Sequence, residues 1–135
     1  MTDAENDRWT PTLVIRALRV AFSRAPRLGN APAMFSFVAT AALTDLGSRS
    51  PEFIALMLRA RAIPAGLSLR EMCRERAGWQ RSRAALYRRS DAGAVRVAAA
   101  LNAEGVAVPA ALVAMRWRPG RDRRRRELAS PLWRA

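Results

Sequence analysis

The sequence has no histidine, no lysine and only one cysteine, Cys73. The absence of histidine excludes the usual serine and cysteine triads, most zinc sites and the commonest general base. The absence of lysine excludes Schiff-base chemistry and the lysine of a phosphate-binding P-loop. A single cysteine allows no intrachain disulfide and no multi-cysteine metal site, which favours a reducing compartment. We therefore expect no enzyme, no metal and no cofactor.

Long apolar runs are also missing. The longest uncharged run, residues 28–44, is interrupted by Gly29, Asn30 and Pro32 and is too weakly apolar to span a bilayer. Residues 1–7 are acidic and polar, unlike a signal peptide. These features predict a cytoplasmic protein with no membrane partner. With 135 residues, half of them hydrophobic, the chain can bury one modest core.

Arginine dominates the charge, and it lies in two blocks. The chain carries 24 basic residues, all arginine, against 11 acids, a formal net charge of +13. Residues 61–96 hold nine arginines and three acids, and residues 116–134 hold eight arginines and two acids, so each block has a net charge of +6. Clustered arginine is typical of a surface that binds phosphates. A bias toward arginine codons would explain the missing lysine but not the clustering, whereas solubility or an acidic protein partner remain alternatives.

Apolar periodicity predicts helices throughout, with no useful strand-like alternation. A Thr10-Pro11 start favours a first helix of about four turns, and Ser50-Pro51 favours another, because each pair offers a capping hydroxyl and a first-turn proline. Residues 31–45 form either a buried or a partner-facing helix. Further helices are predicted over 68–77, 82–102 and from 109. The helix over 82–102 has Gly93 as a weak point, at a cost of about 1 kcal/mol relative to alanine. Its predicted inner side comprises Leu86, Tyr87, Ala94, Val97, Ala98 and Leu101.

Residues 68–89 have the outline of a helix-turn-helix. Ser68-Leu69-Arg70-Glu71 is a capping box that opens a short helix, and Gly78 lies in the following turn. The second helix would begin at Ser82, with Leu86 as a buried anchor on Met72 and Cys73. The turn is about two residues longer than the ordinary one. A register with Trp79, Ala84 and Tyr87 buried keeps the ordinary spacing but exposes Leu86, and a plain helical hairpin with solvated arginines is the simplest alternative.

The chain also resembles a family of uncharacterised bacterial and prophage helix-turn-helix proteins. The resemblance is carried by Trp9-Thr10 near the start of an amphipathic helix and by Leu69-Arg70-Glu71, Ser82-Arg83, Tyr87-Arg88-Arg89 and Leu101-Asn102 toward the end. Ser90 stands where that family usually has an aromatic residue, and residues 29–50 do not match it. The resemblance implies DNA binding in a phage-related or regulatory setting.

Together these patterns predict an all-α protein: an N-terminal helical region (1–64), a helix-turn-helix region (65–115) and a basic arm (116–135). We expect sequence-specific binding of double-stranded DNA by a homo-oligomeric, phage-related transcriptional regulator. The alternatives are a DNA-packaging adaptor similar to a terminase small subunit, and a module for an acidic protein partner. In the recognition helix, Arg83 and Arg88 would read bases in the major groove, and Arg81, Ser82 and Arg89 would contact the backbone. The arm would add affinity through Arg121, Arg123, Arg124, Arg125 and Arg126.

Overall fold

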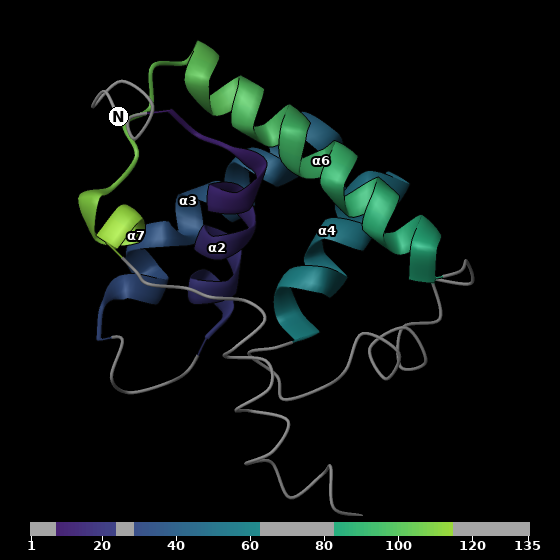
Figure 1. Ribbon diagram of the computed structural model, residues 1–135, viewed down its shortest axis with the longest axis horizontal. Coiled ribbons are helices and arrows are strands. Elements are labelled where there is room, and N and C mark those ends of the chain that lie inside the picture. Colours follow the sequence, from purple (N-terminus) through teal and green to yellow (C-terminus); the bar gives the residue numbers. More distant parts are fainter. Residues whose placement is uncertain (1–7, 24–28, 63–82, 115–135) are drawn as a thin grey trace, which may run out of the picture.

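The computed structural model describes residues 8–23, 29–62 and 83–114. These residues form five helices and no strand: α2 (Pro11–Phe22), α3 (Ala31–Leu46), α4 (Pro51–Ala62), α6 (Arg83–Ala103) and α7 (Ala110–Ala114) (Figure 1). The predicted all-α class is therefore confirmed for this part of the chain. The predicted helix over 68–77, the turn after it and the arm 116–135 lie outside the described residues. None of the helices in the described ranges is long and apolar enough to cross a membrane.

Two helix starts follow the predicted capping chemistry. The Thr10 hydroxyl accepts a hydrogen bond from the Leu13 N–H at 3.2 Å, and the Ser50 hydroxyl accepts one from the Phe53 N–H at 3.1 Å. Proline follows each cap, where its missing N–H costs no helical hydrogen bond. The predicted length of the first helix was wrong, because α2 has 12 residues, little more than three turns. It ends where Ser23 takes an extended backbone conformation.

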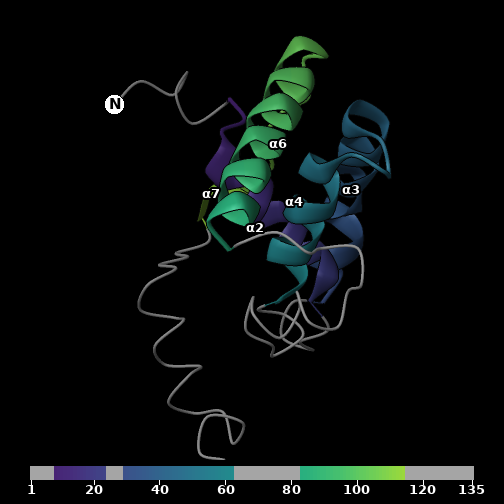
Figure 2. The same cartoon turned by 90° about the vertical axis from the view of Figure 1, so that its right-hand side faces the viewer.

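The main core lies between α2, α3, α4 and the C-terminal half of α6. Helix α6 contacts α2, α3 and α4, and Figures 1 and 2 show it running across the bundle that these three helices form. We use the name main core for its buried side chains, which include Val14 and Leu18 of α2, Phe35 and Val38 of α3, Val97 and Leu101 of α6 and Leu112 of α7. The helix over 31–45 is thus buried on one face, while Met34 and Leu43 remain exposed on α3.

The two ends of the described chain are joined at Trp9. Its side chain is buried, meets the Phe37 ring edge-on at 5.9 Å between centroids, and donates from Nε1 to the Val106 carbonyl at 3.1 Å. Asn102 binds the Trp9 backbone on both sides: Oδ1 accepts from the Trp9 N–H at 2.8 Å, and Nδ2 donates to the Trp9 carbonyl at 3.0 Å. This pair of hydrogen bonds fixes the entry to α2 against the end of α6.

Gly105 lets the chain turn at the end of α6. Its φ of 70° lies in the left-handed region that glycine adopts most readily. The Val106 N–H then bonds the Leu101 carbonyl at 3.0 Å, and the Gly105 N–H bonds the Asn102 carbonyl at 3.1 Å. These two bonds are those of a Schellman motif. The motif brings Val106 back beside Trp9.

Gly93 has a packing role that its low helix propensity does not reveal. A Cβ at this position would lie 3.1 Å from the Glu52 carbonyl oxygen and 3.2 Å from Leu46 Cδ1. The glycine therefore lets α6 approach the end of α3 and the start of α4 closely. Describing it only as a weak point of the helix was wrong, because a larger residue would push these elements apart.

Candidate nucleic-acid interface

The N-terminal half of α6 rests on α4 through a small apolar cluster. The cluster consists, among the described residues, of Ala55, Leu58 and Ala62 of α4 and Leu86 of α6, and we call it the second cluster. Leu86 is completely buried, which confirms its predicted burial. Its predicted partners, Met72 and Cys73, lie outside the described residues. Alanines at two of the four positions let α4 and α6 pack closely.

Arg59 of α4 connects three residues on the adjoining turn of α6. Its Nη1 donates to the Ser90 hydroxyl at 3.1 Å and to Asp91 Oδ1 at 2.5 Å, and its guanidinium stacks over the Tyr87 ring, 5.0 Å from the centroid. The Ser90 hydroxyl in turn donates to the Tyr87 carbonyl at 3.0 Å. Ser90 is fully buried, so this position requires a small polar side chain. Tyr87, predicted on the inner side, is half-buried beneath Arg59.

Two further arginines of α6 lie on one edge of the helix and pair with acids of the preceding elements. Arg89 donates to Glu52 Oε1 at 3.0 Å, and Arg96 donates to the Asp45 carbonyl at 3.2 Å with its Nε 3.9 Å from Asp45 Oδ2. Seven residues separate the two arginines, so they share an edge of the helix two turns apart. Both side chains stay exposed, at 46% and 55%. We call this the arginine edge.

Glu52 is the acid most affected by this arrangement. A hydrogen bond from its own backbone N–H lowers the pKa of Glu52 below the ordinary value of 4.5, and the side chain and charge of Arg89 lower it further. Glu52 lies in the first turn of α4, where the helix dipole also favours a negative charge. Glu52 is therefore ionised at neutral pH and holds Arg89 at the edge of α6.

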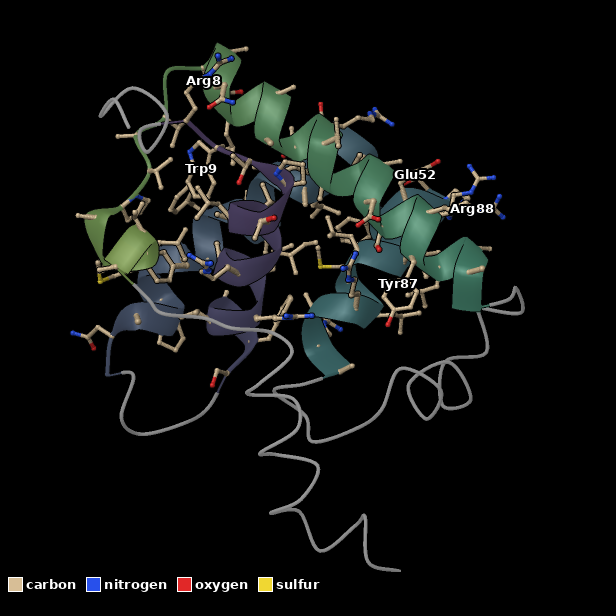
Figure 3. All side chains as sticks on the ribbon, viewed as in Figure 1. Arg8, Trp9, Glu52, Tyr87 and Arg88 are labelled. Atoms are coloured by element: carbon tan, nitrogen blue, oxygen red, sulfur yellow. The ribbon has the colours of Figure 1, made fainter. Side chains whose placement is uncertain are left out.

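Arg88 points away from the bundle. It is exposed, and it forms no hydrogen bond or ion pair with any residue in 8–23, 29–62 or 83–114. Figure 3 shows its side chain projecting beyond α6, on the other side of the helix from Tyr87. Because Tyr87 and Arg89 are both fixed against α4, Arg88 is held in solvent on a well-supported turn.

The described residues include three of the predicted DNA contacts. Arg88 and Arg89 are consecutive residues of α6, and Arg83 is the first residue of this helix. Arg81 and Ser82, and the arm residues Arg121, Arg123, Arg124, Arg125 and Arg126, lie outside the described residues. Sequence reasoning missed Arg96 as a member of the interface. Its seven-residue spacing from Arg89 was the signal that could have found it.

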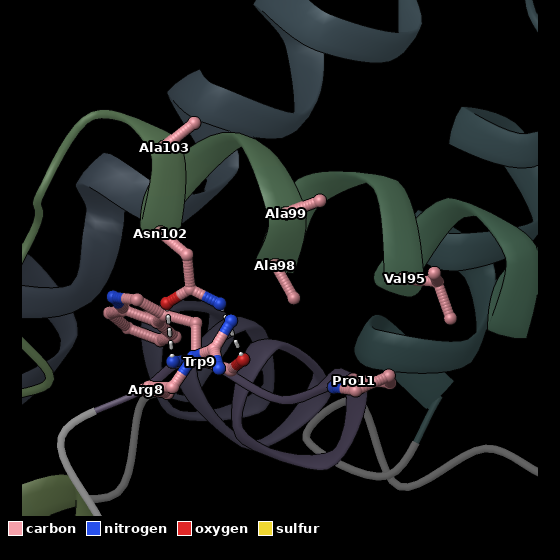
Figure 4. A pocket seen from close by; sticks show the side chains of 8 residues that line it. All are labelled: Arg8, Trp9, Pro11, Val95, Ala98, Ala99, Asn102 and Ala103. Carbon is pink, nitrogen blue, oxygen red and sulfur yellow. Dashed lines mark hydrogen bonds between the residues drawn. The ribbon is translucent and has the colours of Figure 1, made fainter. Parts of the chain in front are cut away.

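Other kinds of site find little support in the described ranges. No group of three or more histidine, cysteine, aspartate or glutamate side chains is placed there to hold a metal ion. An open groove of about 480 Å³ runs between Arg8, Trp9 and Pro11 on one side and α6 on the other (Figure 4). Its α6 wall consists of Val95, Ala98, Ala99, Asn102 and Ala103. It contains one charged side chain, Arg8, and no nucleophile beside a base.

The chain matches no protein-family model, no curated protein and no solved structure. The resemblance to prophage helix-turn-helix proteins therefore stays a prediction from sequence motifs. A helical fold by itself does not indicate an activity, so the function has to be argued from the arrangement of the arginines.

Proposed function

We propose that this chain binds double-stranded DNA sequence-specifically through α6 and acts as a regulator of transcription. The observation that carries the proposal is the exposure of Arg88, Arg89 and Arg96 on one well-supported helix. A helix with arginines on its outer side fits the major groove, where arginine can bind guanine through two hydrogen bonds. The net charge of +13 adds a general attraction for a polyanion.

The arginine edge serves as the contact with the phosphate backbone. Arg89 and Arg96 are paired with Glu52 and Asp45, but exposed ion pairs of this kind contribute only about 0–1 kcal/mol. DNA phosphates can therefore compete with these carboxylates for the guanidinium groups. In the absence of DNA, the same carboxylates keep both arginines extended along the edge.

Arg88 is the base-reading residue in this proposal, together with Arg83 at the start of α6. Arg88 has no partner to give up among the described residues, so it can enter the groove without breaking a contact. Arg81 and Ser82 would position the helix. Arg121, Arg123, Arg124, Arg125 and Arg126 would contribute affinity that depends on salt but not on sequence.

The proposal is tested by selecting duplexes from a random library and then measuring fluorescence anisotropy at several salt concentrations. Arg88→Ala should weaken binding to the selected duplex by about tenfold or more and reduce the preference over random duplex, since a bidentate base contact contributes about 1–3 kcal/mol of discrimination. Replacing the five arm arginines with glutamine should instead weaken binding to both duplexes equally and reduce the salt dependence.

Thr40→Glu is the matched control for net charge. Thr40 is exposed on α3, outside the helix that carries Arg88, and the substitution also lowers the net charge by one. If Arg88 contacts DNA, Thr40→Glu should leave affinity nearly unchanged. Equal losses for the two variants would show that only overall charge matters, and an absence of duplex binding at low salt would overturn the proposal altogether.

A further inference from the structure

The C-terminal half of α6 presents small, uncharged side chains to solvent. Ala92, Val95, Ala99 and Ala103 recur at three- and four-residue spacing and are all exposed, with Val95 at 53%. Alanine at these positions leaves the helix backbone accessible to close approach by another helix. The groove beside Trp9 lies along the same stretch, so this face is recessed at one edge as well as apolar (Figure 4).

Opposite charges mark the two ends of this face. Asp91 lies at its start, and although Oδ1 is bound to Arg59, the side chain stays 61% exposed. Arg8 lies at its end, lining the groove next to Asn102 and Ala103. Eleven residues separate Asp91 from Asn102, which is close to three helical turns, so Asp91 and the part of the groove that Arg8 lines lie along one edge of α6, about 17 Å apart along the helix axis. A surface with this pattern is complementary to itself when it is turned end to end.

We propose that a second copy of this chain binds here, with the two α6 helices packed antiparallel across a two-fold axis. Arg8 of each copy then meets the partner's Asp91, and Val95 of each copy packs against the partner's Ala99. The two-fold axis passes close to position 97 of α6, midway between the charges. The interface is one helix wide, so we expect a weak dimer that forms at micromolar concentrations or above.

The dimer gives the DNA-binding proposal a geometry, and this part of the inference rests on that proposal. A two-fold axis perpendicular to two antiparallel helices keeps both arginine edges on the same side of the pair. Arg88 lies nine residues from the axis, and the partner's α6 extends only six residues past it, so the partner helix does not cover Arg88. Residue 86, the middle of the first two turns of α6, lies about 17 Å from the axis at 1.5 Å per residue. The two N-terminal halves are then about 33 Å apart, close to the roughly 34 Å between major-groove half-sites one turn apart. The expected target is therefore a palindrome.

Sedimentation equilibrium of the full chain, from low micromolar to submillimolar concentration and without DNA, tests for the dimer. Ala99→Glu brings a carboxylate against the partner's Val95 on both sides of the axis, so it should weaken dimerisation by at least about tenfold. Thr40→Glu is the control, since it places the same side chain on the exposed side of α3. A wild-type chain that stays monomeric throughout, or equal behaviour of the two variants, would overturn the proposal.

Disulfide cross-linking tests the antiparallel register. In a Cys73→Ser background, Ala92→Cys protein should cross-link with Ala103→Cys protein when the two are mixed, because eleven residues bring both to the same face at opposite ends. Neither should cross-link efficiently with itself. Cross-linking of each variant with itself would indicate parallel helices, and no cross-linking in either case would place the interface elsewhere; both results contradict the proposal.

The outcomes separate this inference from the DNA-binding proposal. If the chain dimerises through α6 but binds no duplex, the inference about the interface is supported and the proposed function is wrong. If one copy of the chain binds the selected duplex, and Ala99→Glu leaves the affinity unchanged, the proposed function is supported and the proposed dimer is wrong. Palindromic preference that disappears with Ala99→Glu supports both.

Discussion

The two apolar regions that hold α6 differ in size and in what surrounds them. The main core joins α2, α3, α4, α7 and the C-terminal half of α6, and it is closed by the hydrogen bonds of Trp9. The second cluster is smaller among the described residues and is supplemented by the contacts of Arg59 and Arg89. One helix therefore contributes to the main core through its C-terminal half, whereas Arg88 and Arg89 lie exposed in its N-terminal half. A recognition surface can change there without disturbing the core.

The largest expected effect comes from removing a leucine of α6 from each region in turn. Leu101→Ala should destabilise the fold by about 4 kcal/mol, because Leu101 is buried among large side chains that cannot close around the cavity. Leu86→Ala should cost about 2 kcal/mol, since two of its buried partners among the described residues, Ala55 and Ala62, are small and form fewer contacts with it. Urea denaturation followed by circular dichroism measures both. Equal costs would contradict the difference in packing between the two regions.

Hydrogen exchange of the same two variants tests whether the two regions open separately. Leu86→Ala should speed exchange of amides in the first turns of α6 while leaving amides near Leu101 protected, because the main core stays intact. Uniformly faster exchange along α6 would mean that the helix opens as one unit and that the two regions are not separable.

Asn102→Ala tests the hydrogen bonds that close the main core. The substitution leaves the Trp9 N–H and carbonyl without their side-chain partner, so we expect a loss of about 2 kcal/mol in urea denaturation. Asn102→Asp is the matched variant, because it keeps the acceptor for the Trp9 N–H but loses the donor to the Trp9 carbonyl. Its stability in urea should not exceed that of the wild type. Wild-type stability of Asn102→Ala would show that water replaces the amide without cost.

Gly93→Ala tests the junction between the two regions. An exposed helical site would gain about 1 kcal/mol from this substitution. At Gly93 the new Cβ would press on the Glu52 carbonyl, a backbone atom that cannot rotate away, so we expect a net loss of about 1 kcal/mol. Thermal denaturation gives the sign of the change. Ala92→Gly, one position away on the exposed face, is the reference for propensity alone, and a gain for Gly93→Ala would mean that α6 and α4 have room to separate.

The smallest expected effect is the pH dependence due to Glu52. Because the folded state lowers the pKa of Glu52, the ionised carboxylate stabilises the fold at neutral pH, and this contribution is lost as the pH falls from about 5 through the lowered pKa. Its size should be below about 1 kcal/mol, since the pair with Arg89 is exposed. Glu52→Gln should remove this part of the dependence. Identical profiles of stability against pH in the two proteins would show that Glu52 contributes nothing.

Local signals in the sequence predicted the helices well. Thr10-Pro11 and Ser50-Pro51 act over three residues, so their capping bonds can be inferred without knowing what packs nearby. The burial of Leu86 and Leu101 followed from helical spacing. The length of α2 did not, because its end depends on the conformation of Ser23 rather than on the apolar pattern.

Contacts between distant residues could not be predicted in this way. Nothing near Asn102 indicates that its amide binds Trp9, and nothing near Glu52 indicates that Arg89 lies beside it. The close approach at Gly93 depends on how α3 and α4 cross α6. The same holds for the candidate interface, because the sequence identified Arg88 and Arg89 but not the acids that hold the arginine edge.

The hydrogen bonds of Trp9 also bear on how the chain folds during synthesis. Trp9 forms hydrogen bonds with Asn102, 93 positions further along the chain, and with Val106, 97 positions further along. Arg16 donates a hydrogen bond to the Leu112 carbonyl, 96 positions away. These contacts of high sequence separation raise the contact order of the fold. They can form only after Val106 and Leu112 have left the ribosome. The nascent helices α2 to α4 therefore lack these contacts until then, which makes this interval the one in which chaperone contact would matter most.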